Sequence, residues 1–109
     1  MALVYVDSSA GSTAVWTAPA NATVSGIHVS AVAGAAGATT VMVKVVVLGA
    51  TLRGGAVQTG AGVVSSTGAS FYFPTGLTLA AGATITCSLV NQADTAIGSA
   101  ITTVAVDYK

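Results

Sequence analysis

Titratable and nucleophilic side chains are scarce in this chain. It contains one histidine, His28, one cysteine, Cys87, three aspartates and no glutamate. The aspartates, Asp7, Asp94 and Asp107, are far apart in sequence. A nucleophile, a base and an orienting acid could converge in the fold from Cys87, His28 and one aspartate. No known nucleophile signature surrounds Cys87, and we therefore predict that the chain is not an enzyme.

Metal and cofactor motifs are also missing from the sequence. Zinc-ligand spacings, calcium-binding loops and phosphate-binding glycine loops do not occur, so we expect no metal and no cofactor. Cys87 alternates with Ile85 and Leu89, which predicts a buried free thiol that packs as a small hydrophobe. For His28 we expect the solvent side of a strand, and a pH-sensing role at an interface is the alternative.

The low charge excludes further classes of function. Only 6% of the 109 residues are charged and the net charge is zero, against about 25% charged residues in an ordinary domain. Such a chain offers no basic surface for nucleic acid or for anionic membranes. Its longest apolar stretch, residues 45–50, is far below the roughly 18 residues of a membrane span. The N-terminus lacks the basic region of a secretory signal, so we expect synthesis in a cytosol.

The elements that must position these side chains are short β-strands. Apolar and polar residues alternate in segments that end at Gly or Pro, and no segment has helical spacing. We expect strands at residues 4–6, 14–17, 24–32, 39–48, around 52, at 56–65, 71–73, 83–90 and 101–108. A Gly/Ala loop at 33–38 separates two of them, and Pro74 is expected to end the aromatic strand. The pattern predicts one all-β domain over residues 1–109, an antiparallel two-sheet sandwich of jelly-roll type with about eight strands.

The segment 39–48 is unusual because both of its faces are apolar. One face carries four valines, Val41, Val43, Val45 and Val47. The other face carries Met42, Lys44, Val46 and Leu48. One face of a sandwich strand normally meets water, so this second face requires a cover, which is either a loop of the same chain or another subunit. We expect a contact with another subunit, with Lys44 at its rim or as a polar break within it.

Two aromatic residues are further candidates for contacts. Phe71 and Phe73 share one face of their strand and are expected in the core, which leaves Tyr72 on the opposite face. There Tyr72 could stack on a sugar or on a partner protein. Trp16 is either an anchor in a contact pocket, because Trp is enriched at interface hot spots, or part of the core.

Four segments carry a resemblance to a known group of proteins. They are VWTAPANATVSGIHVS at 15–30, TTVMVKVVV at 39–47, FYFPTGLTLAAGATI at 71–85 and the final VAVDY. In this order they resemble small virion proteins of tailed bacteriophages. The resemblance spans nearly the whole chain, and its motifs are structural rather than chemical.

The resemblance implies a β-sandwich component of the virion. It implies a capsid decoration, or cement, protein that binds the outside of the head shell, with the major capsid protein as partner and a homotrimer as the common assembly. A small tail or fibre subunit is the alternative within the same group. A carbohydrate-binding module that uses Tyr72 or Trp16 as a stacking platform is a third reading, from another class of function.

Overall fold

The computed structural model describes residues 2–7, 13–33, 39–59, 65–97 and 100–109, and this part of the chain forms eight β-strands. The strands are β1 (Ala2–Asp7), β2 (Ala14–Thr17), β3 (Ala22–Ala33), β4 (Thr39–Val47), β5 (Ala50–Thr59), β6 (Ser65–Leu79), β7 (Thr84–Asn91) and β8 (Ile101–Tyr108). The predicted all-β class is confirmed. The Gly/Ala loop expected at 33–38 lies, apart from the last residue of β3, outside the described residues. Among the residues that are described, none belongs to a helix long and apolar enough to cross a bilayer.

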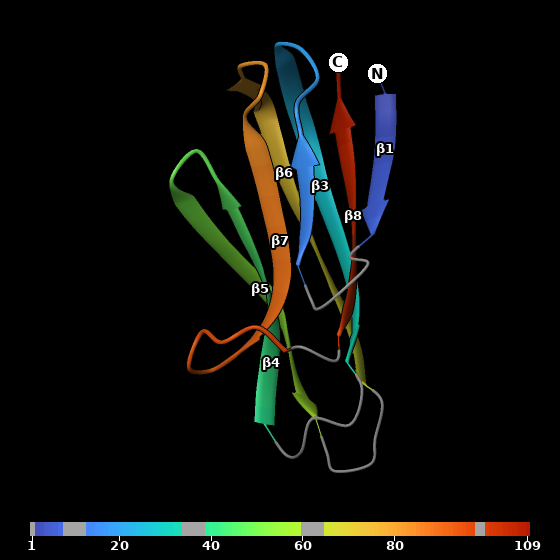
Figure 1. Ribbon diagram of the computed structural model, residues 1–109, viewed down its shortest axis with the longest axis vertical. Helices are drawn as coiled ribbons and strands as arrows, with labels where there is room; N and C mark the ends of the chain where they lie inside the picture. The colour runs from blue at the N-terminus through green and yellow to red at the C-terminus, as the bar shows by residue number, and fades with distance from the viewer. Residues whose placement is uncertain (1, 8–12, 34–38, 60–64, 98–99) are drawn as a thin grey trace.

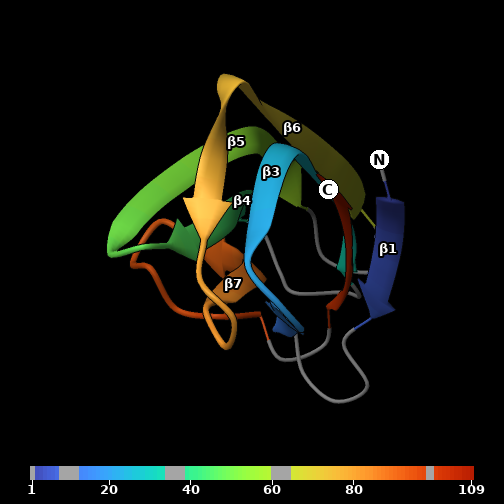
Figure 2. The ribbon, with the colours of Figure 1, turned by 90° about the horizontal axis from the view of Figure 1, so that it is seen from above.

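The strands form two antiparallel four-stranded sheets that pack face to face (Figure 1). Sheet A has the order β1-β8-β3-β6 and sheet B the order β2-β7-β4-β5. The hydrogen-bonded pairs β1–β8, β2–β7, β3–β6 and β4–β5 are those of one long hairpin rolled over itself. This is the jelly-roll arrangement, and it confirms the predicted fold class. Seen from above, β5 and β6 lie next to each other and join the two sheets along one side (Figure 2).

The core lies between the two sheets because apolar residues alternate along most strands. Its main cluster includes Ile27, Val45, Ile85 and Val106, all with no exposed surface. A smaller cluster at the other end contains Ala31, Val41, Leu89 and Ala100. The four valines of β4 all face inward and are buried, as their spacing predicts.

Two expected strand breaks are wrong, because the irregular residues lie in bulges within longer strands. Pro74 does not end β6, which continues to Leu79. β6 is an edge strand of sheet A and leaves the β3 ladder at this point, where a missing N–H costs little. The glycines at 54–55 do not divide β5 either. Gly55 has a φ of +66° and forms a bulge opposite Met42, a position that favours glycine.

Candidate interaction surfaces

The outer face of sheet B carries the residues that alternate with the buried valines of β4. Lys44 lies beside Arg53 of β5 on one side and Ser88 of β7 on the other. Val46 lies beside Thr86 of β7, which in turn pairs with Val15 of β2. The strands therefore present two different rows on one face, a charged row at Lys44 and a largely apolar row at Val46.

The two cations of the charged row form ion pairs with a residue of the same chain. The 91–97 loop follows β7 and extends across the sheet toward β5 (Figure 1). Asp94 accepts a hydrogen bond from Lys44 Nζ on one carboxylate oxygen at 2.8 Å and from Arg53 Nη1 on the other at 2.7 Å. Three of the six charged residues of the chain thus meet in one ion cluster.

The 91–97 loop is built to present Asp94. The Asn91 side-chain oxygen accepts hydrogen bonds from the backbone N–H groups of Ala93 and Thr95, at 2.9 and 3.0 Å. Asp94 has a φ of +65°, in the left-handed region that Asp tolerates better than most residues. The hydrogen bonds from Lys44 and Arg53 lower the pKa of the Asp94 carboxyl, because both favour its charged form. The cluster is exposed to solvent, so its stabilising effect is small.

The same loop also reaches the row beyond Lys44. Val90 of β7 lies beside Met42 in the sheet and is only 2% exposed. Ala96 forms a bridge with Val90, and the Ile97 N–H donates to the Leu89 carbonyl. At Lys44 a loop of the same chain therefore contacts the outer face, which is one of the two alternatives. For Lys44 the ion pair with Asp94 is an interaction within the chain, and a contact with another subunit at Met42 and Lys44 stays a prediction.

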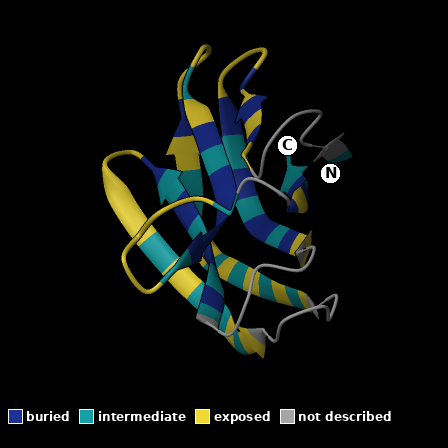
Figure 3. Ribbon diagram, turned by 60° about the horizontal axis from the view of Figure 1, so that its bottom comes forward, coloured by how far each residue is buried: buried dark blue, intermediate teal, exposed yellow. Residues whose placement is uncertain are grey.

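The opposite end of this face is open to solvent. We call Val15, Val46, Leu48 and the Thr86 between the two valines the apolar end of sheet B. Val15 is 45% exposed and Leu48 is 61% exposed, whereas Val46 is half-buried. Figure 3 shows the exposed turn between β4 and β5 as a continuous exposed segment. A contact with another subunit remains a prediction for Val46 and Leu48.

Leu48 adopts a backbone conformation that is unfavourable for a leucine. Leu48 and Gly49 form a two-residue turn between the paired residues Val47 and Ala50, with φ values of +50° and +75°. Positive φ at both central positions defines a type I′ turn, where Asn-Gly is the preferred sequence. A large apolar side chain is thus held in a strained conformation and exposed, a combination that favours a role outside the folding of the chain.

The two aromatic candidates lie elsewhere. Trp16 is 4% exposed, and its ring contacts that of Tyr108 at a centroid distance of 5.0 Å inside the sandwich. The prediction that Trp16 anchors a contact is wrong and the core alternative holds. Buried and exposed residues alternate along β2, so Trp16 lies on the same inward face as the buried Ala14. Tyr72 is on the outer face of sheet A and is 70% exposed, where its ring meets the edge of His28. Phe71 and Phe73 pack against the main core, as expected.

The groups considered for catalysis are separated by the fold. Cys87 is buried on the inner side of sheet B, and burial raises the pKa of its thiol to about 12. His28 lies on the outer face of sheet A, where it is hydrogen-bonded to Ser70. The described part of the chain holds no group of three or more His, Cys, Asp or Glu side chains arranged to bind a metal ion. The absence of enzymatic activity stays a prediction.

Two features of the site have no local signal in the sequence. Asp94 lies 50 residues from Lys44 and 41 from Arg53, and only the β4–β5 register brings the two cations side by side. Val15 joins Val46 through the β2–β7 pairing, which depends on the long-range topology. Leu48, predicted as the last residue of the strand at 39–48, lies instead in the two-residue hairpin turn, because β4 ends at Val47.

Comparison with known proteins gives fold similarity alone. No protein family model matches the sequence, and no curated protein sequence matches it. Among solved structures, the tripod from the baseplate of bacteriophage Tuc2009 is similar with a TM-score of 0.51 and 13% identity, covering 95% of this chain. The chain spans 62% of the length of that protein.

Two other similar structures have lower scores. A carbohydrate-binding module of family 35 from Cellvibrio japonicus has a TM-score of 0.49 and 8% identity, over 94% of this chain and 92% of that one. A structure of infectious bursal disease virus has a TM-score of 0.37 and 13% identity, over 95% of this chain and 29% of the viral chain. The structural neighbours thus include a phage baseplate protein, a carbohydrate-binding module and a virus particle protein.

Proposed function

We propose that this chain is a non-catalytic structural subunit of a bacteriophage virion, and that it acts as a decoration protein on the outside of the head shell. The apolar end of sheet B carries this proposal. Val15 and Leu48 are exposed there, and Leu48 is kept in a strained turn where a smaller polar residue would fit better. Exposed apolar side chains of this kind are suited to contact with another protein surface.

The mechanism is stabilisation by binding. A subunit that binds only the assembled shell lowers the free energy of that state by RT ln(1 + [L]/Kd) at each site. Many copies, each with modest affinity, then add up over the lattice. With three of the six charges already paired within the chain, we expect the contact to be mainly apolar and weakly dependent on salt. Self-association of the chain, as a trimer, belongs to the same proposal.

The test is binding of the purified chain to mature heads that lack it. The proposal predicts saturable binding with a stoichiometry that follows the symmetry of the shell, and a higher temperature of head disruption. A virion reconstruction with no density for the chain on the head would rule it out. The variant Val46→Asp should not bind, whereas Ser30→Asp, on the exposed outer face of sheet A, should bind normally.

A small tail or baseplate subunit is the second candidate. The fold similarity to the baseplate tripod of bacteriophage Tuc2009 favours it. This candidate uses the same apolar end of sheet B but predicts few copies per particle, whereas a head decoration protein is present in many. Quantitative gel densitometry of purified virions, with the major capsid protein as internal standard, separates the two.

A further inference from the structure

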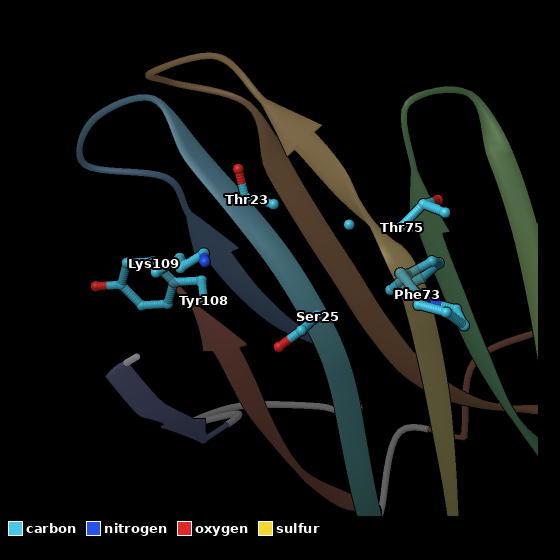
Figure 4. Close-up of a pocket in the computed structure, with 8 residues that line it drawn as sticks. Thr23, Ser25, Phe73, Thr75, Tyr108 and Lys109 are labelled. Carbon is cyan, nitrogen blue, oxygen red and sulfur yellow. The ribbon is translucent and has the colours of Figure 1, made fainter.

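A cleft opens where β6 leaves β3. Val24 pairs with Leu77 and Gly26 pairs with Tyr72, so the four residues 73–76 of β6 lie opposite Ser25 alone. The cleft has a volume of about 230 Å³. Its walls come from three elements: β3, the β6 bulge and the end of β8 (Figure 4). Pockets for drug-sized ligands begin at roughly 300 Å³. This cleft is smaller, and its size suits one six-membered ring of a ligand.

The walls combine rings with hydroxyl groups. The lining includes Phe73, Pro74 and Tyr108 together with the hydroxyl-bearing Thr23, Ser25 and Thr75. Phe73 and Tyr108 also pack against the main core, so they contribute only part of their rings to the cleft. In Figure 4, Thr23 and Ser25 lie on β3 between Tyr108 on one side and Phe73 and Thr75 on the other. Each hydroxyl both donates and accepts hydrogen bonds. This combination of groups matches a ligand that has an apolar face and hydroxyls at its rim.

Contacts within the chain fix the walls of the cleft. Thr23 exchanges two backbone hydrogen bonds with Lys109, at 2.8 and 3.0 Å, and the Ser25 hydroxyl donates to the Asp107 carbonyl at 3.2 Å. Gly76 has a φ of +80°, and a Cβ at this position would lie 2.5 Å from the Thr23 side chain. The close approach of Gly76 to Thr23 therefore fixes the bulge against β3.

An exposed aromatic platform adjoins the cleft along the same two strands. Tyr72 directly precedes Phe73, and its ring meets the edge of His28 with centroids 5.5 Å apart and planes at 68°. His28 Nδ1 is hydrogen-bonded to the Ser70 hydroxyl at 2.9 Å. The His28 ring lies over Gly26, where a Cβ would be 3.0 Å from Nε2. The platform is thus held in place on one side, while the Tyr72 ring remains open to solvent.

We propose that this seam between β3 and β6 binds a neutral oligosaccharide, with one sugar ring in the cleft and the next stacked on Tyr72. Asp107 pairs with Gly26 beside the platform and Lys109 lines the cleft. These two charges are opposite, which favours an uncharged ligand. A proline-rich peptide would require a groove lined by several exposed aromatic rings, whereas Phe73 and Tyr108 are partly buried against the core and Tyr72 is the largely exposed ring described at this seam. The inference is independent of the apolar end of sheet B and adds a glycan-binding activity to the structural role.

The experiment is a screen of the folded chain on an array of neutral hexose and N-acetylhexosamine oligosaccharides, followed by titration of the strongest binder. We expect Tyr72→Ala to lower the affinity by about tenfold, the effect of losing one stacked ring. Tyr72→Phe, which keeps the ring, should restore most of the affinity. Thr75→Val should weaken binding by removing one hydroxyl from the cleft. Ile101→Ala is the matched control, because Ile101 is exposed at the other end of sheet A.

Three results would overturn the inference: no binding to any neutral oligosaccharide, binding that both Tyr72→Ala and Thr75→Val leave unchanged, or preferential binding of a polyproline peptide. Tyr72 is largely exposed, so Tyr72→Ala should keep the melting temperature of the wild type. The same variant should bind heads normally. Loss of glycan binding and loss of head binding are therefore measured separately.

Discussion

The outer faces of the two sheets are built from the same alternation but have different chemistry. The outer face of sheet B has a charged row covered by the 91–97 loop and, next to it, an apolar end with Val46 and Leu48. The outer face of sheet A carries small polar residues such as Ser30 and Ser70, with Tyr72 as its exposed ring. The outer face of sheet A also exposes the paired Val32 and Ile101, so the two faces differ in the ion cluster of sheet B and the Tyr72 platform of sheet A rather than in apolar exposure alone.

This difference teaches that charge scarcity alone does not locate an interface. The ion cluster of Lys44, Arg53 and Asp94 shows that the outer face of β4 is contacted from within the chain at Lys44. What remains is a smaller surface, at the β4–β5 turn. This surface contains three exposed or half-buried apolar side chains, Val15, Val46 and Leu48.

The largest effect is expected from a charge at the apolar end of sheet B. Val46→Asp should weaken self-association and head binding by about a hundredfold, because an unpaired carboxylate would be buried in the contact. Because Val46 is only half-buried in the single chain, we expect the substitution to lower the free energy of unfolding less than it weakens the contact. Analytical ultracentrifugation and head-binding isotherms measure the loss. Equal losses of binding affinity for Val46→Asp and Ser30→Asp would show that the outer face of sheet B is not the contact surface.

The second effect is on the junction that holds the two sheets together. A Cβ at Gly55 would lie 2.6 Å from the Gly68 carbonyl oxygen on β6, and φ is +66°. Gly55→Ala should lower the free energy of unfolding by about 2 kcal/mol or more. Gly49→Ala, with positive φ but nothing within 4 Å, should cost about 1 kcal/mol. Urea denaturation gives both values, and equal costs would show that the Gly55–Gly68 approach is unimportant.

The third change separates stability from binding at Leu48. Leu48→Asn should raise the free energy of unfolding by about 0.5–1 kcal/mol, because Asn-Gly suits a type I′ turn. The same variant should bind heads or its own copies more weakly, because an exposed apolar contact is lost. Thermal melts and the binding assay are made on the same preparation. A variant that is more stable and binds fully would remove Leu48 from the contact surface.

The smallest effect is expected at Asp94. Its pKa is lowered in the folded chain, so the contact with Lys44 and Arg53 stabilises the fold above the pKa of the unfolded state. That contribution is lost as the pH falls through the lower folded-state pKa, below about pH 4. At neutral pH, Asp94→Asn should speed hydrogen exchange in the 91–97 loop and change global stability little. Unchanged exchange in this loop would show that the cluster does not hold it.

Much of the fold follows from local patterns. Alternation in β2, β4, β7 and β8 identifies the strands and the residues that face the core, and turn residues separate them. The bulges at Gly55 and Pro74 cannot be predicted from local patterns. Whether a glycine or a proline ends a strand depends on which strand lies beside it. Pro74 is tolerated only because β6 is at an edge of sheet A.

The candidate surfaces are predictable in part. The spacing in β4 correctly groups Met42, Lys44 and Val46 on one face, but the cover from the 91–97 loop depends on contacts more than 40 residues apart. The cleft at Ser25 arises from a register shift that no local pattern contains. Trp16 shows the limit of residue type as a guide, since a typical interface residue here fills the core.

The most direct test of the central claim is the molar mass of the chain in solution, measured by light scattering on a sizing column over a range of concentrations. We predict an oligomer for the wild type and the mass of one chain for Val46→Asp, with Ser30→Asp behaving as the wild type. A wild-type chain that has the mass of a single copy at every concentration would contradict self-association through the apolar end of sheet B.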